Sequence, residues 1–171
     1  MTVVRSMRED DVRDALVMMR ELAAFEGYLE DFRVTERDLL RFGFGPERKF
    51  TCFVAASSDL GERLGIAVVH SEPWNYQMAP TFVLKELYVR NGNRGAGVGT
   101  ALFRAAEAYC RSVGAVRLRW LVLEGNTDAA RFYKNLGGEP SAEWRLWGLP
   151  QVVDPPSPRV GASKPVLSLE A

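Results

Sequence analysis

Two neighbouring stretches decide the fold of this chain: Leu84-Lys85-Glu86-Leu87-Tyr88-Val89-Arg90, and then Arg94-Gly95-Ala96-Gly97-Val98-Gly99-Thr100. The first predicts an apolar strand, and the second predicts a glycine-rich turn that opens into an amphipathic helix. Glycines let the backbone approach a ligand closely, and the unpaired N–H groups and the dipole at a helix start attract an anion. The sequence therefore predicts a cradle for a phosphate-bearing small molecule.

Glycine-rich turns before helices bind several kinds of ligand, and their spacing separates them. A Walker nucleotide loop needs a lysine directly before its Ser/Thr, but here Gly99 precedes Thr100. A dinucleotide fingerprint reads G-x-G-x-x-G with an acidic residue about twenty residues on, whereas these glycines alternate and residues 117–119 read Arg-Leu-Arg. The remaining pattern is Arg-x-x-Gly-x-Gly, which begins at Arg94 and resembles the pyrophosphate loop of the GCN5-related N-acetyltransferases. A turn that merely connects strand and helix is the open alternative.

A second motif follows about thirty residues later and reads Glu124-Gly125-Asn126-Thr127-Asp128-Ala129-Ala130-Arg131-Phe132-Tyr133-Lys134-Asn135-Leu136-Gly137-Gly138. It predicts a strand end and a short helix with Thr127 as N-cap and Gly137 just after its C-terminus. The simpler interpretation of Phe132-Tyr133 is a pair of core aromatics. In this order and spacing the two motifs resemble the GCN5-related N-acetyltransferases (the GNAT superfamily), which bind acetyl-coenzyme A (acetyl-CoA). The resemblance implies an α/β GNAT fold, a mixed central sheet of about six to seven strands flanked by about four helices.

The resemblance extends to a narrower group, the diamine (spermidine/spermine) and thialysine N-acetyltransferases. It covers about residues 2–149, so we expect an N-acetyltransferase domain at 1–149 and an extended, Pro-rich C-terminal tail at 150–171. The segments that carry it are 20–26, 35–40, 42–45, 72–74, 84–89 and 143–146.

Composition limits the classes of function. A chain of 171 residues fits one domain, and its 22 basic and 22 acidic residues balance, which argues against nucleic acid or an anionic membrane as partner. No apolar run approaches the length of about 18 residues that spans a membrane, and residues 1–5 lack a signal-peptide core. Cys52 and Cys110 stand in apolar contexts, as reduced core residues of a cytoplasmic protein do. His70 is the only histidine, so we expect no metal site and no histidine-based triad.

Hydrophobic periodicity and turn residues predict alternating strands and helices. A capping box is expected where Thr35 precedes Asp38 by three positions. We expect strands at 3–6, 49–56, 64–70, 82–90, 117–123 and 144–148, and helices at 10–25, from 35, at 97–113 and at 127–136.

Acetyl transfer to an amine needs a neutral nucleophile, a stabilised oxyanion and a protonated leaving group. An alkylammonium has a pKa of about 10.4, so a base or desolvation must help to remove its proton. Tyr133 matches the catalytic tyrosine of the family, and its phenol can protonate a leaving thiolate. Glu86 can act as the base directly or through water, or it is simply a salt-bridged strand residue. Backbone N–H groups near Leu87 and Val89 can stabilise the oxyanion.

The resemblance also implies which residues bind acetyl-CoA. Asn126 matches the position that orients the cofactor beside the second helix, although an ordinary helix-start residue is the alternative. The expected cofactor-binding residues are Leu87, Tyr88, Val89, Arg94, Gly95, Ala96, Gly97, Val98, Gly99, Thr100, Asn126, Ala129 and Tyr133.

The expected substrate-binding residues differ in their chemistry. Glu26 belongs to an acidic stretch that suits an amine, although such a run is more often a solvated face. Lys85 stands where the resembled enzymes have a glutamate; it repels a cation but can meet the carboxylate of a lysine analogue such as thialysine. Aromatic faces also suit ammonium groups, with core packing as the alternative. The full set is Phe25, Glu26, Trp74, Lys85 and Trp144.

Together these features predict a cytoplasmic N-acetyltransferase that uses acetyl-CoA and moves an acetyl group directly to a primary amine of a small molecule. The amine is expected to be of the polyamine or lysine-analogue type, and the resemblance implies a homodimer. Two alternatives stay open. Lys85 favours a non-catalytic acyl-CoA-binding module, whereas an open groove would favour an enzyme that acetylates protein lysines or N-termini.

Overall fold

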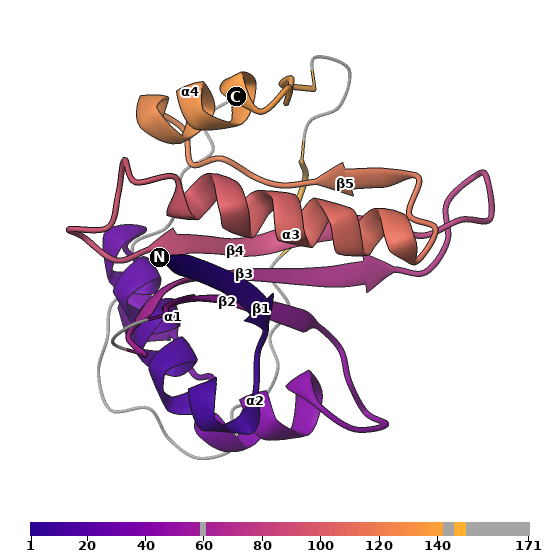
Figure 1. The fold of residues 1–171 in the computed structure, drawn as a ribbon. Helices are drawn as coiled ribbons and strands as arrows, with labels where there is room; N and C mark the ends of the chain where they lie inside the picture. The colour runs from indigo at the N-terminus through magenta and orange to yellow at the C-terminus, as the bar shows by residue number, and fades with distance from the viewer. Residues whose placement is uncertain (59–60, 142–145, 150–171) are drawn as a thin grey trace. The chain divides into compact units, whose positions relative to one another are not determined.

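One mixed β-sheet organises the chain (Figure 1). The computed structural model describes residues 1–58, 61–141 and 146–149. Within these residues five strands lie side by side in the order of the sequence, antiparallel from the first to the fourth, with the fifth parallel to the fourth. The strands are β1 (Thr2–Ser6), β2 (Thr51–Ser57), β3 (Arg63–Glu72), β4 (Thr81–Val89) and β5 (Arg117–Arg119).

Helices cover both faces of the sheet in the described part of the chain. The first two pack on one face, and the third packs on the opposite face (Figure 1). Side chains of the fourth join the core beneath the third. The helices are α1 (Val12–Phe25), α2 (Glu36–Gly43), α3 (Val98–Ser112) and α4 (Thr127–Asn135), and short 3-10 turns cover Glu9–Asp11 and Leu29–Asp31.

Strand alternation divides the interior into two cores. Successive side chains of a strand point to opposite faces of its sheet. On β3, Ile66 and Val68 enter the core beneath α1 and α2, whereas Ala67 and Val69 enter the core beneath α3. The central strands are therefore buried on both faces, which is why they read as almost continuous apolar runs.

The predicted α/β architecture is confirmed, with differences at its C-terminal side. β5 ends at Arg119 instead of continuing to Leu123. Residues 146–148 of the strand expected at 144–148 are not in a strand, while Trp144 and the tail expected at 150–171 lie outside the described residues. The described sheet accordingly has five strands rather than six to seven.

The N-cap predicted from the sequence is confirmed at α2 and is wrong at α4. The hydroxyl of Thr35 accepts a hydrogen bond from the Asp38 N–H, and the Asp38 carboxylate accepts one from the Thr35 N–H, which confirms the expected capping box. At α4 the expected N-cap, Thr127, is wrong. Asn126 caps this helix because its Oδ1 accepts from the Ala129 N–H at 3.0 Å, and Thr127 is already the first helical residue.

A β-bulge at Lys85 interrupts the alternation of side chains along β4. Val69 pairs with Leu84 and Val68 pairs with Glu86, so Lys85 has no partner on β3. Because the side-chain period of a strand is two, one extra residue moves all following side chains to the other face. Leu84 therefore faces α3, while Glu86 faces α1.

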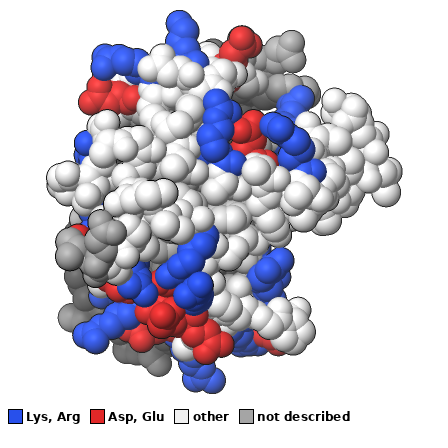
Figure 2. Space-filling view, in the orientation of Figure 1, with Lys and Arg blue, Asp and Glu red and all other residues white. Residues whose placement is uncertain are grey.

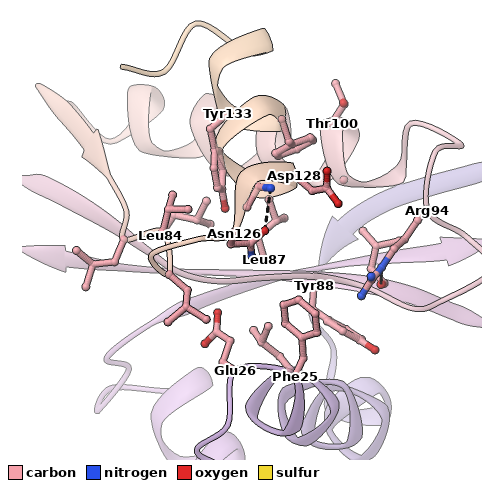
Figure 3. Close-up of a pocket in the computed structure, with 18 of the residues that line it drawn as sticks. Phe25, Glu26, Leu84, Leu87, Tyr88, Arg94, Thr100, Asn126, Asp128 and Tyr133 are labelled. Carbon is pink, nitrogen blue, oxygen red and sulfur yellow. Dashed lines mark hydrogen bonds between the residues drawn. The ribbon is translucent and has the colours of Figure 1, made fainter. Parts of the chain in front are cut away.

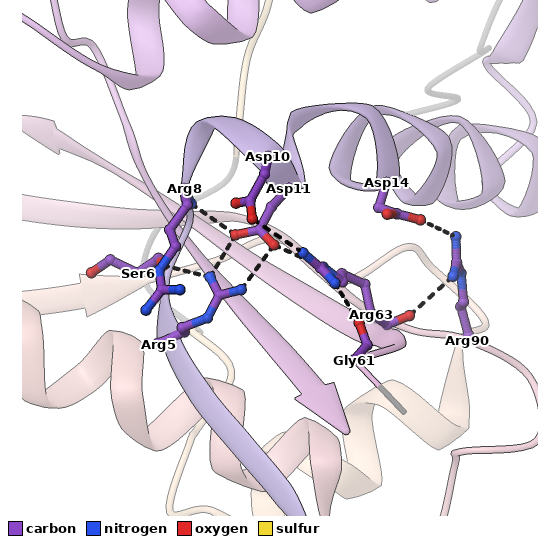
Figure 4. Close-up of polar contacts among 9 residues, drawn as sticks. All are labelled: Arg5, Ser6, Arg8, Asp10, Asp11, Asp14, Gly61, Arg63 and Arg90. Atoms are coloured by element: carbon purple, nitrogen blue, oxygen red, sulfur yellow. Dashed lines mark hydrogen bonds and ion pairs between the residues drawn. The ribbon is translucent and has the colours of Figure 1, made fainter. Parts of the chain in front are cut away.

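A buried carboxylate joins β1, α1 and β3 (Figure 4). Asp11 is fully buried and accepts hydrogen bonds from Arg5 Nη1 at 2.5 Å, Arg63 Nε at 2.8 Å and the Arg8 N–H at 2.8 Å. Burial raises the pKa of the Asp11 carboxyl, but the hydrogen bonds from Arg5, Arg8 and Arg63 outweigh it and lower the pKa to about 2. Asp11 is therefore ionised and ties the first strand to the rest of the fold.

Charges of both signs are interspersed on the face seen in Figure 2, in keeping with the zero net charge of the chain. Cys52 and Cys110 are free and buried, as expected of core cysteines. None of the helices in the described ranges combines the length and apolar composition that crossing a bilayer requires.

Candidate active site

Two strands that start side by side separate next to the bulge. β5 pairs with β4 only from Thr81 to Val83, so from Leu84 onward β4 has no strand on that side among the described residues. The Arg90 N–H donates to the Leu64 carbonyl on β3, and antiparallel pairing alternates from there. The main-chain groups of Leu87 and Val89 therefore face away from β3, toward the gap.

A cavity of about 610 Å³ occupies this gap (Figure 3). Its walls come from the end of α1, from β4, from the turn before α3, from the chain after β5, and from α4. All of these residues belong to the unit Met1–Gly138. The volume lies within the range of about 300–1,000 Å³ that is usual for small-molecule sites.

The turn before α3 forms an anion cradle at one end of the cavity. Gly95 and Gly97 have φ values of 78° and 80°, a left-handed conformation that favours glycine. The first helical hydrogen bond of α3 runs from the Ala101 N–H to the Gly97 carbonyl at 3.0 Å, so the N–H groups before Ala101 have no acceptor within the helix. With the helix dipole behind them, these donors suit a phosphate.

Arg94 connects the cradle to α1. Its Nε donates to the Val89 carbonyl at 3.2 Å, and its guanidinium lies 5.8 Å from the ring of Phe25 and 5.9 Å from the ring of Tyr88. Aromatic rings attract a cation over their faces, so these contacts hold Arg94 over the cavity. Figure 3 shows Arg94 and Phe25 on neighbouring parts of the wall.

Tyr133 projects from α4 into the cavity. Figure 3 shows its hydroxyl pointing from the helix toward β4. Its ring packs on Trp120, with the ring centroids 4.8 Å apart. Burial raises the pKa of the Tyr133 phenol to about 12, with a further increase from the negative charge of Glu26. The hydroxyl is therefore protonated at neutral pH and can donate its proton.

Charged side chains gather at the end of the cavity near α1. Glu26 and Lys85 line it, whereas Glu86 faces the core side of β4 and is outside the lining. Lys85 Nζ lies 3.4 Å from Glu86 Oε1, and Glu86 Oε2 is buried with no hydrogen-bond partner in the described chain. Burial raises the pKa of Glu86, and the Lys85 ammonium opposes this increase. A carboxylate with a raised pKa is better suited to accept a proton near neutral pH.

Most of the residues predicted for the site meet in this cavity. Of the remainder, Val98 is buried in the α3 core, Ala96 is exposed at the turn, and Trp74 is 68% exposed on the loop between β3 and β4, away from the cavity. The predicted residues that line the cavity are Phe25, Glu26, Lys85, Leu87, Tyr88, Val89, Arg94, Gly95, Gly97, Gly99, Thr100, Asn126, Ala129 and Tyr133.

Several lining residues were not expected from the sequence. Their apolar members signal no chemistry, although residues 121–123 stand directly before the second motif and were expected to form a strand. Asp128 gave no signal either, because an acidic residue in the first turn of a helix is the common choice beside the positive end of the dipole. The additional residues are Leu22, Leu84, Leu121, Val122, Leu123, Asp128 and Phe132.

Residues 16–137, which include the glycine-rich turn before α3, all but the last residue of the second motif and every residue of the cavity, match the Acetyltransferase (GNAT) family. The chain therefore belongs to the GNAT family of acetyl-transferring enzymes, and the resemblance read from its motifs is confirmed.

Known acetyltransferases resemble this chain in sequence or in structure. Thialysine N-epsilon-acetyltransferase of Mus musculus is 32% identical over 152 residues, which cover 85% of this chain and 89% of the relative. Spermidine/spermine N(1)-acetyltransferase-like protein 1 of Homo sapiens is 24% identical over 150 residues, 85% of this chain and 22% of that protein. The solved structure of an aminoglycoside acetyltransferase from an uncultured soil metagenomic sample, in complex with sisomicin, superposes with a TM-score of 0.70 at 16% identity, over 89% of this chain and 96% of that one. This structure shares the fold.

Proposed function

We propose that the protein transfers an acetyl group from acetyl-CoA directly to a primary amine of a small molecule. One observation carries the proposal: a single cavity runs from the anion cradle before α3 to the hydroxyl of Tyr133 and the carboxylate of Glu26. A phosphate-bearing donor fits the first end, and an amine fits the second. The relatives named for thialysine and for spermidine/spermine support an amine acceptor of the lysine-analogue or diamine type.

The residues present fit acetyl-CoA, which supplies an acetyl group activated as a thioester. The N–H groups at the start of α3, with Arg94, would hold its diphosphate. The outward main-chain groups of Leu87 and Val89 would hold its linear part and stabilise negative charge at the reacting carbonyl. Asn126 uses its amide oxygen to cap α4, so its NH₂ group is the part that can orient the donor.

Proton transfers are assigned to two side chains. Tyr133 holds a proton at its Oη and would give it to the departing thiolate. Glu86 would accept the amine proton through water, because its carboxylate is near the cavity but does not line it. Glu26 lines the cavity and would attract the ammonium form of the acceptor before its proton is removed.

An acetylation assay with a panel of amines tests the function. The purified protein is mixed with acetyl-CoA and either diamines, lysine analogues, aminoglycosides or a lysine peptide, and CoA release is followed together with the mass of the acceptor. We expect release with at least one small amine. Release with the peptide alone would instead support a protein acetyltransferase. Acetyl-CoA binding by calorimetry without release for any amine would support a non-catalytic acyl-CoA-binding module.

Replacing Arg94 should weaken binding of the donor. Hydrogen bonds to charged groups contribute about 1.5–3 kcal/mol, so Arg94→Ala should raise the Kd for acetyl-CoA about 10- to 100-fold. Calorimetry measures this, and the loss should shrink at high salt because part of it is electrostatic. Arg111→Ala is the matched control, since Arg111 lies in the last turn of α3, at the end far from the cradle, and pairs with Glu107. Equal affinity of the two variants would contradict the role of Arg94.

Replacing Lys85 should change which amines are accepted. A lysine at this position repels a second ammonium and attracts a carboxylate, and its side chain is 60% exposed, so the interaction is partly screened. We expect Lys85→Glu to shift the kcat/KM ratio toward diamines over lysine analogues by about tenfold. Lys85→Gln, which removes the charge without reversing it, should lie between the two. A ratio that stays constant across the three proteins would show that Lys85 does not read the acceptor.

Assembly and location are part of the same proposal. By analogy with the resembled enzymes, we propose a cytoplasmic homodimer. Light scattering coupled to size-exclusion chromatography distinguishes a dimer from a monomer, and a monomer with full activity would show that the site is complete in one chain.

A further inference from the structure

Tyr133 sits in a small aromatic cluster that the chemistry above does not use. The indole of Trp120 packs on its ring at 4.8 Å between centroids, with the planes inclined by 35°. Phe103 of α3 meets the ring of Trp120 edge-on at 5.4 Å and lies 6.0 Å from the ring of Tyr133. Two aromatic side chains from other elements therefore hold the phenol ring on the side that faces away from the cavity.

Gly138 makes room for this cluster. A Cβ at position 138 would lie 2.7 Å from Cζ2 of Trp120, closer than real contacts allow, and 3.1 Å from its Cη2, which is tight. The N–H of Gly138 also donates to the Tyr133 carbonyl at 2.9 Å. Gly138 thus contacts both the indole of Trp120 and the backbone of Tyr133. The indole ring occupies the space that a side chain at position 138 would fill.

We propose that Trp120 is a positioning residue for Tyr133: its indole, admitted by Gly138, fixes the phenol ring so that the hydroxyl points into the cavity. The proposal rests on the proposed function, in which Tyr133 donates a proton. The placement of Trp120 supports it, because this residue stands between β5 and the stretch 121–123 that lines the cavity. A smaller side chain at this position would remove the shortest of the three ring contacts to Tyr133, since the rings of Phe132 and Phe103 lie at 5.1 and 6.0 Å.

Kinetics of four variants test the proposal. A misplacement of about 1 Å can cost about 100-fold in rate, so Trp120→Leu should lower kcat about 10- to 100-fold with little change in the Kd for acetyl-CoA. Trp120→Phe keeps a ring against Tyr133 and should restore most of the rate. Gly138→Ala should lower kcat on its own, and by less in the Trp120→Phe background. Phenylalanine lacks the Cζ2 and Cη2 atoms of the indole that the new Cβ would meet, whereas the contact of 3.1 Å with the Tyr133 carbonyl is present in both backgrounds.

A titration of the phenol supplies a second readout that does not depend on turnover. Tyrosine labelled with ¹³C at its hydroxyl-bearing ring carbon is followed by NMR, and Tyr133→Phe assigns the signal. Burial disfavours the phenolate, so opening the site in Trp120→Leu should lower the pKa of Tyr133 toward the ordinary tyrosine value. Trp120→Phe should leave this pKa near that of the wild type.

The outcomes distinguish the proton-donor role of Tyr133 from the positioning role of Trp120. If Tyr133→Phe turns over like the wild type, the proton-donor role fails, yet a shifted titration in folded Trp120→Leu still supports the positioning of the ring. A folded Trp120→Leu variant with wild-type kcat and an unshifted titration would overturn the proposal. If Trp120→Leu does not fold, the Gly138→Ala variants decide. A loss of kcat from Gly138→Ala that is equal in the wild-type and Trp120→Phe backgrounds would also overturn the proposal.

Discussion

Tyr133→Phe should lower kcat about 10²- to 10⁴-fold, the range typical of losing a general acid. The variant keeps the ring that packs on Trp120 and loses the hydroxyl that faces the cavity. The Kd for acetyl-CoA should therefore change little, and the loss should appear in kcat. Steady-state kinetics with the best amine of the panel, together with calorimetry, measure both quantities.

The control for this variant is Tyr76→Phe. Tyr76 is 85% exposed and does not line the cavity, so the same chemical change should leave kcat at the wild-type level. Turnover of Tyr133→Phe equal to that of Tyr76→Phe would remove Tyr133 from the proton-transfer role. Because the pKa of Tyr133 is about 12, the wild-type phenol stays protonated through neutral and mildly alkaline pH. Any fall of kcat below pH 10 must then come from another group.

Asp11→Asn should destabilise the fold by about 3–5 kcal/mol, the usual cost of removing one partner from a buried ion pair. The change leaves the guanidinium groups of Arg5 and Arg63 against a neutral amide in a site where Asp11 is fully buried. Urea unfolding followed by circular dichroism gives the free energy of unfolding. We expect the midpoint to fall with little change in the slope. Asp10→Asn is the control. Asp10 is 67% exposed, and its carboxylate lies 3.7 Å from the Arg63 guanidinium, beyond hydrogen-bond distance, so its loss should cost little.

This loss should depend on pH in a defined direction. The pKa of Asp11 is about 2 in the folded chain, below its ordinary value of 3.8, so the ionised carboxylate stabilises the fold fully above pH 3.8. That contribution disappears as the pH falls through about 2. The difference in unfolding free energy between wild type and Asp11→Asn should therefore shrink over this interval. A difference that stays constant would show that Asp11 acts through packing alone.

The cradle could be predicted from the sequence because its physics is local. Gly97 must adopt a positive φ at the start of α3, and the arginine three residues before it reaches the same turn. Tyr133 was predicted in another way, because the second motif resembles that of the GNAT superfamily and places Tyr133 at its catalytic tyrosine. The helix of that motif depends on neighbours within a few positions, but the role of its tyrosine was implied only by the resemblance.

Features that depend on pairing between distant segments could not be predicted. The bulge at Lys85 follows from how β4 meets β3, so the sequence did not show that Glu86 would turn toward α1. The early end of β5 at Arg119 follows from its separation from β4, which leaves residues 121–123 to line the cavity. Trp74 was expected to bind substrate, but the fold leaves its side chain exposed and outside the cavity lining.

The extra residue in β4 also has a consequence for how this gene can change over time. Glu86 pairs with Val68 on one face of the sheet, and Leu84 pairs with Val69 on the other. Removing the codon for Lys85 would therefore restore regular pairing with β3 and leave the following side chains of β4 on their present faces. Such a deletion would spare both cores, and its effect would fall on the cavity, where it would remove the ammonium group that lies beside Glu86.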